Sequence, residues 1–183
     1  RGLGDVYKRQ VAVGYNAGES VSTGTLNTII GGLAGDALTS GSRNTAIGYA
    51  ALSGEDANGY NVAVGYETLK VQNAGADAHN VAVGYQAGKS ISTGVENTII
   101  GGLAGDALTT ALGNTAVGLK ALSTDTTGRY NVAIGHSTLE NQSFAGSEAV
   151  YNVAVGYFAG NDITTGNENV LIGGLAGDAL TTG

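Results

Sequence analysis

Residues 27–48 read NTIIGGLAGDALTSGSRNTAIG, and they contain the unit that repeats through almost the whole chain. An Asn, a strip of three mostly apolar residues and a Gly return after 17 residues. Strips begin at residues 11, 28, 45, 62, 81, 98, 115, 132, 153 and 170, which gives coils of 17, 17, 17, 19, 17, 17, 17, 21 and 17 residues before a partial tenth. Such regularity predicts a solenoid in which equivalent residues of successive coils stack.

The residue types within the strips predict β-strands. The first and third positions are Val, Ile or Thr, and the second is Ala except at Ile29, Ile99 and Leu171. This alternation places the first and third positions on one face and the second on the other. A small residue six positions after each start, such as Ala17, predicts a second short strand, and pairs such as Thr23-Gly24 predict a turn. The predicted fold is all-β, a parallel β-solenoid or β-roll of about ten 17-residue coils with two short strands each.

An Asn precedes nine of the ten strips, and Gln10 precedes the first. Stacking predicts a ladder in which each side chain bonds to the backbone or to the Asn of the next coil. We interpret this ladder as structural, and a row of ligand-binding amides is the alternative. The ladder residues are Asn27, Asn44, Asn61, Asn80, Asn97, Asn114, Asn131, Asn152 and Asn169.

The composition narrows the classes of function. The chain has no Cys, which excludes disulfides and thiolate metal sites, and its net charge of −7 without basic clusters argues against nucleic-acid binding. No apolar run is long enough to predict membrane insertion. Residues 1–10, RGLGDVYKRQ, match no repeat and resemble translated linker peptides that contaminate assembled sequence libraries. We therefore predict a leader over 1–10 that lies outside the fold and one repeat domain over 11–183; a native capping segment is the alternative for 1–10.

Two apparent chemical motifs do not predict a reaction or a cofactor. GGLAGDAL resembles a calcium-binding nonapeptide, but Ala34 stands where that motif needs Gly, and Asp36, Asp106 and Asp178 would lie about 19 Å apart because they recur every four coils. We expect each Asp to bond its own backbone, with calcium as the alternative. His79 and His136 have no Ser or acid placed beside them as in a triad. The expectation is a non-enzymatic protein without a cofactor.

The coils form rounds of four, and the last coil of each complete round carries an insertion of two or four residues. Insertions on one edge of a solenoid are often its binding face. We therefore treat the segments 70–79 and 140–151 as candidate recognition loops; surface loops without a partner are the alternative. The candidate residues are Lys70, Asn73, Asp77, His79, Glu140, Phe144, Glu148 and Tyr151.

Self-association is expected because a 17-residue coil encloses little. The Ala residues at the second strip position predict a flat, close-packing surface that a single chain would expose and three chains around an axis would bury. The chain also stops within a coil at Gly183, which is consistent with a longer array or a filament. The expected partner is therefore the chain itself, as a homotrimer or a filament, together with a cell-surface receptor or glycan.

The strips NTAIGYAAL (44–52), NVAVGYETL (61–69) and NVAVGYQAG (80–88) resemble repeats of tail-fibre-like proteins of phages and bacteria. More distantly they resemble the heads of YadA-type trimeric autotransporter adhesins. The resemblance covers residues 11–183 and implies a left-handed parallel β-roll of three chains that serves in surface attachment. The repeats of those heads are shorter than 17 residues, and this chain shows no coiled-coil stalk.

Two classes of function follow from the sequence. The first is a structural segment of an extracellular, cell-surface or virion fibre that extends and presents attachment sites. The second is a binding module in its own right, either a cell-surface adhesin or an ice-binding solenoid with a flat Thr face. Thr28, Thr45, Thr98 and Thr115 alternate with Val between them, which disfavours ice binding.

Overall fold

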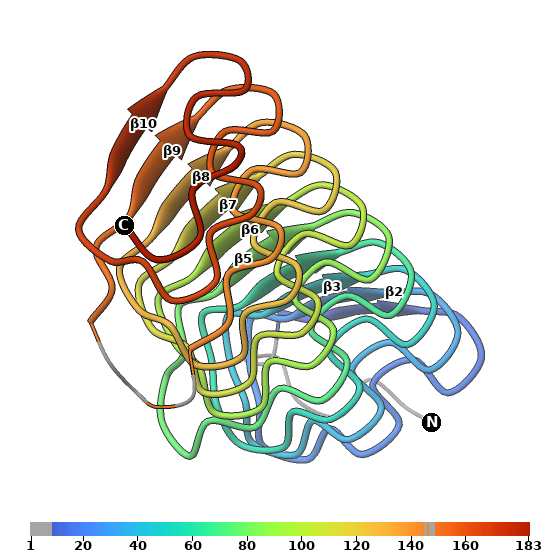
Figure 1. Cartoon of the computed structure of the whole chain (residues 1–183). Helices are drawn as coiled ribbons and strands as arrows, with labels where there is room; N and C mark the ends of the chain where they lie inside the picture. Colours follow the sequence, from blue (N-terminus) through green and yellow to red (C-terminus); the bar gives the residue numbers. More distant parts are fainter. Residues whose placement is uncertain (1–8, 145, 147–148) are drawn as a thin grey trace.

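The computed structural model describes residues 9–144, 146 and 149–183, and its chain winds into a solenoid with one three-residue strand per coil (Figure 1). Every strand pairs in parallel with the strand before and after it in sequence, so the ten strands form one sheet in sequence order. The strands are β1 (Val11–Val13), β2 (Thr28–Ile30), β3 (Thr45–Ile47), β4 (Val62–Val64), β5 (Val81–Val83), β6 (Thr98–Ile100), β7 (Thr115–Val117), β8 (Val132–Ile134), β9 (Val153–Val155) and β10 (Val170–Ile172).

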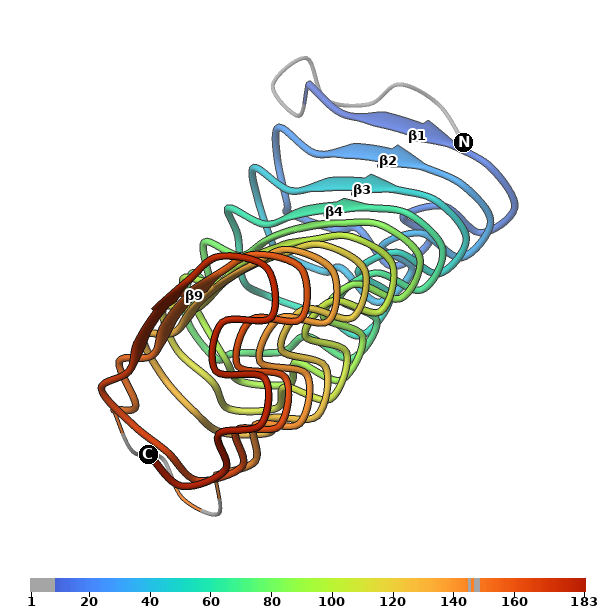
Figure 2. The same cartoon turned by 45° about the horizontal axis from the view of Figure 1, so that its top comes forward.

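The strands stack in exact register along one wall of the solenoid (Figure 2). The first residue of each strand pairs with the first residue of the next, as in Val11 with Thr28. The longer coils keep this register, because Val62 pairs with Val81 and Val132 with Val153. The additional residues are therefore accommodated in the loops, which supports the predicted 17-residue coil with tolerated insertions.

The second strip position faces the interior, and this corrects the predicted position of the Ala surface. Ala46, Ala63 and Ala116 are fully buried within the chain, and so is Ile99 at the same position. The first and third positions face outward and are half-buried or exposed. A small side chain at the second position suits a narrow interior, since long side chains from the opposite wall fill the remaining space. The flat surface of the molecule is therefore formed by the first and third positions.

The segment predicted as a second strand forms turns instead. Coils are named here by the first strip residue, and in coil 28 Leu33 and Gly35 have φ of 57° and 50°. Left-handed residues in alternation cannot form an extended strand. The segment still stacks, since Gly35 N donates to Ala51 O at 2.9 Å in the next coil. Two isolated parallel bridges, Val95 with Leu112 and Arg129 with Ala149, are further pairings outside the sheet.

The side chains that fill the interior differ from coil to coil, although they come from the same positions of the repeat. Coil 28 has Gly35 at its eighth position, where an added Cβ would lie 2.8 Å from Leu38 Cδ1. Coil 45 has Leu52 at the eighth position and the acid Glu55 at the eleventh, the place that Leu38 takes in coil 28. All three of these larger side chains are fully buried. Coil 28 has Ile29 at the second position, where coil 45 has Ala46, so a smaller eighth residue is matched by a larger second residue and the layer stays filled.

Candidate functional site

The asparagines before the strips form a continuous, buried ladder. Each side-chain carbonyl accepts the backbone N–H of the Asn in the next coil; for example, Asn114 N donates to Asn97 Oδ1 at 3.0 Å. Asn97 Nδ2 donates in turn to Ala111 O at 2.9 Å, across the corner of the next coil. Asn97 and Asn114 are almost completely buried. Apart from Asn61 Nδ2, the ladder amides bond to the chain itself, and we interpret the ladder as structural.

The outward face of the sheet is a flat apolar surface. Its third strip positions are Val or Ile in every coil, and Val13 and Ile100 are 58% and 38% exposed. Ten strands about 4.8 Å apart and about 10 Å long give a face of roughly 400 Å². The largest apolar patch on a typical monomer covers about 300–600 Å² and is often functional, so this face is a candidate interaction surface.

In three successive coils a Tyr follows the Gly that closes the strip, and these residues, Tyr49, Tyr66 and Tyr85, form the tyrosine row. Tyr49 stacks on Tyr66, and Tyr66 stacks on Tyr85, with ring centroids 5.5 Å apart in both pairs. Each ring is about half exposed. The ring faces stack on one another, and the edges and hydroxyls are left in solvent. The row therefore adds amphipathic area beside the apolar strips.

In the first candidate loop, every proposed recognition residue has a contact within the chain. Lys70 Nζ bonds the Glu67 carboxylate, Asn73 N donates to a carbonyl of the next coil, and Asp77 Oδ1 accepts Gly59 N at 3.1 Å. The His79 ring stacks on Tyr60 with centroids 4.8 Å apart. These contacts tie the loop to neighbouring coils.

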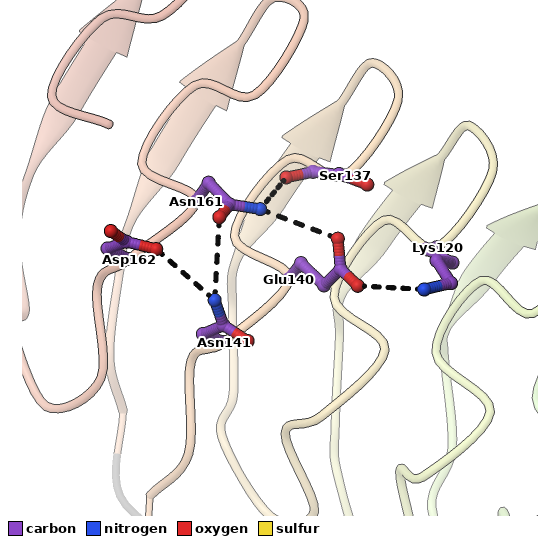
Figure 3. Close-up of polar contacts among 6 residues, drawn as sticks. All are labelled: Lys120, Ser137, Glu140, Asn141, Asn161 and Asp162. Atoms are coloured by element: carbon purple, nitrogen blue, oxygen red, sulfur yellow. Dashed lines mark hydrogen bonds and ion pairs between the residues drawn. The ribbon is translucent and has the colours of Figure 1, made fainter. Parts of the chain in front are cut away.

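The second candidate loop begins in a surface network of polar side chains. Figure 3 shows Glu140 between Lys120, whose Nζ lies 3.1 Å from Glu140 Oε1, and Asn161, whose Nδ2 donates to Glu140 Oε2 at 3.4 Å. Asn161 Nδ2 also donates to Ser137 O at 3.0 Å. The network joins three successive coils, and both carboxylate oxygens of Glu140 take part in it.

The two aromatic residues proposed as anchors of the second loop have different settings. Phe144 is half-buried, and its carbonyl accepts Thr127 Oγ1 at 2.9 Å. Tyr151 is 52% exposed and stacks on Tyr130 with centroids 5.5 Å apart. Glu148 lies outside the described residues. Only Tyr151 therefore presents an exposed aromatic edge, and its ring face is shared with the neighbouring coil.

Comparison with protein-family models, with curated proteins and with solved structures finds no match. Among the described residues, no helix has the length and apolarity to cross a membrane.

The aspartates of the GGLAGDAL segments are separate from one another. Burial raises the pKa of Asp36 and Asp106, against the lowering effect of their own backbone N–H groups. Over residues 9–144, 146 and 149–183, no group of three or more His, Cys, Asp or Glu side chains is placed to hold a metal ion.

The structure also contains two buried acids that the sequence analysis missed. Glu55 and Asp125 are fully buried and occupy the eleventh position of equivalent coils. Acids are rarely buried, so the residue type by itself did not indicate an interior position. Alignment of the repeats could have indicated their burial, because the apolar residues Val21 and Leu38 stand at the same position in earlier coils.

Proposed function

We propose that this chain is a segment of the shaft of an extracellular or virion fibre, of the tail-fibre-like or adhesin-like kind, that extends and presents attachment sites. The observation that carries the proposal is one uninterrupted parallel sheet, in register through ten coils, with an apolar outer face. A stack of this kind gains length by adding identical layers, each of which contacts only its neighbours. The central purpose of such a chain is reach and stiffness.

The proposed partner is the chain itself, as a homotrimer that buries the outer sheet face around a common axis. Burial of Val, Ile and Tyr side chains would provide the driving force, at about 25 cal/mol for each Å² of apolar area removed from water. The row of Val and Ile is unbroken from coil to coil, which suits a partner with the same periodicity. The left-handed coil implied by the family resemblance belongs to the same proposal.

Imaging and binding experiments test this function together. Negative-stain images of the full chain should show rods about 5 nm long, since ten layers lie about 4.8 Å apart. A variant in which residues 70–79 and 140–151 are replaced by Gly-Ser segments should form the same rods. Compact particles without a long axis would contradict the shaft.

The alternative is a binding module that uses the insertion loops, and the exposed Tyr151 edge is the observation in its favour. Labelled wild-type chain and the loop-replaced variant can be compared on cell surfaces and on a glycan array. A shaft segment should show no loop-dependent binding. Binding by the wild type that the loop-replaced variant loses would favour the module.

A further inference from the structure

Two equivalent buried acids have different surroundings in the first and second rounds of coils. In the second round, Gln142 Nε2 donates to Asp125 Oδ2 at 2.7 Å, and Asn152 Nδ2 donates to Gln142 Oε1 at 2.9 Å. Asp125 Oδ1 also accepts Gly128 N at 3.1 Å. These buried polar side chains therefore hydrogen-bond one another directly.

In the first round, the corresponding side chains leave four buried atoms without a hydrogen-bond partner. These atoms are Glu55 Oε2, Asn58 Nδ2, Asn61 Nδ2 and Gln72 Nε2. All four residues are at most 6% exposed. An unpaired buried polar group costs about 1–3 kcal/mol, so four in one region of a folded chain call for a partner.

Comparison of the two rounds indicates that the four atoms lie in one region, because their second-round counterparts lie close together. Asn58 stands in coil 45 where Gly128 stands in coil 115. A Cβ added at Gly128 would lie 2.0 Å from Asp125 Oδ2 and 3.2 Å from Asn131 Nδ2. By equivalence, the Asn58 side chain lies between the Glu55 carboxylate and the Asn61 amide.

The bonds in this region connect the same residues. Glu55 Oε1 accepts Asn58 N at 3.0 Å. Burial raises the pKa of Glu55, and the Asn58 side chain, which lies close to the carboxylate, lowers it by a smaller amount. Asn58 Nδ2 nevertheless forms no hydrogen bond of ordinary geometry. Asn80 joins Gln72 to Asn61, since its Nδ2 donates to Gln72 Oε1 at 2.8 Å and its N donates to Asn61 Oδ1 at 3.2 Å.

These bonds fix the hydrogen-bonding character of the site. Gln72 and Asn61 both use their side-chain oxygens on Asn80, so their NH₂ groups are the atoms that face the site. Glu55 Oε2 is an acceptor, and the Asn58 side chain lies beside the same carboxylate. Two fixed donors disfavour a cation, and a carboxylate disfavours an anion. A neutral molecule that accepts two hydrogen bonds and donates one to Glu55 fits the set.

We propose that the interior between coils 45 and 62 is a binding site for one structural water molecule, held by Glu55, Asn58, Asn61 and Gln72. The molecule accepts from Gln72 Nε2 and Asn61 Nδ2 and donates to Glu55 Oε2, with the Asn58 amide beside it. Buried waters typically make about three hydrogen bonds to groups that would otherwise be unpaired. The equivalent place in the second round needs no such molecule, because Gln142 bonds Asp125 directly.

An experimental structure of the full chain at about 1.8 Å resolution tests this site, with the second round as the control in the same map. The expected result is one water peak about 2.7–3.2 Å from Gln72 Nε2 and Asn61 Nδ2, and none between Asp125 and Gln142. A direct Glu55–Gln72 bond without a peak would overturn the proposal. So would an ion, recognised by anomalous signal or by contacts of about 2.3 Å.

The double variant E55D/N58G transplants the second-round pair into the first round. We expect its shorter carboxylate to bond Gln72 directly and the water peak to disappear. A peak that persists unchanged would contradict the assigned ligands. The wild-type map decides the proposal even where this variant fails to fold.

Discussion

At the scale of single residues, the asparagine that precedes nine of the ten strips stabilises the stack through both ends of its side-chain amide. Its carbonyl and NH₂ groups both bond backbone groups of the next coil, as Asn97 does with Asn114 N and Ala111 O. Both partners are backbone groups in a buried corner, where an unpaired group is costly. The repetition of Asn along the chain follows from this double requirement.

The substitution Asn97→Ala tests the ladder. It leaves Asn114 N and Ala111 O without their side-chain partner, so we expect it to lower the free energy of unfolding by about 2–4 kcal/mol. Denaturant unfolding measures the loss. Asn167→Ala is the matched control, because Asn167 is exposed and only its backbone carbonyl accepts a ladder bond. Equal stability of the two variants would contradict the ladder's role.

Glu67 makes a second prediction at this scale, on acid stability. Hydrogen bonds from Lys70, Gln86 and Lys89 lower the Glu67 pKa from 4.5 to about 2. A lowered folded-state pKa stabilises the fold above about pH 4.5, and this stabilisation is lost as the pH falls towards 2. Glu67→Gln should therefore be less stable than the wild type at pH 7, with the difference shrinking below pH 4.5 in thermal unfolding curves. A difference that stays constant down to pH 2 would exclude this linkage.

At the scale of the coil, the glycine that closes each strip sets how closely layers approach. Gly101 has φ of +132°, and a Cβ there would lie 2.3 Å from Gly118 O in the next coil. Both the backbone conformation and the contact exclude a side chain. The closing Gly is thus required by the stacking itself.

Gly101→Ala should therefore disrupt folding far more than a glycine substitution in open space. Gly75→Ala is the matched control, since Gly75 also has positive φ, +72°, but has no atom within 4 Å of an added Cβ. We expect a loss of about 1 kcal/mol for the control, from conformation only. Circular dichroism and thermal unfolding should show G101A largely unfolded or strongly destabilised. Similar melting of the two variants would refute the close-contact explanation.

Sequence reasoning predicted the 17-residue coil and its strand, but not the conformation of the rest of each coil. The 17-residue period and the Val-Ala-Val alternation are direct consequences of stacking, so they are visible in the letters. The second strand was a wrong prediction because its residues alternate into left-handed conformations, and Leu33 or Glu67 gives no sign of this as Gly would. The buried acids were missed because their burial shows only when the coils are aligned, where Val21 and Leu38 occupy the same position.

At the scale of the whole molecule, the face of the sheet to which each strip position points decides where a partner can bind. Ala at the second position was predicted to form the contact surface, but it lines the narrow interior. The surface left for association consists of the first and third positions and the tyrosine row beside them. This change moves the proposed trimer contact to a more apolar face and leaves the proposed assembly intact.

The solution mass of the full chain by multi-angle light scattering tests the central claim most directly. One chain has a mass of 18.1 kDa, and we predict a particle of three times that mass. Ile100→Lys, on the outer sheet face, should reduce it towards a single chain, whereas Thr110→Lys, exposed outside the sheet, should leave it unchanged. A wild-type protein that stays at 18.1 kDa across concentrations would contradict the trimeric shaft.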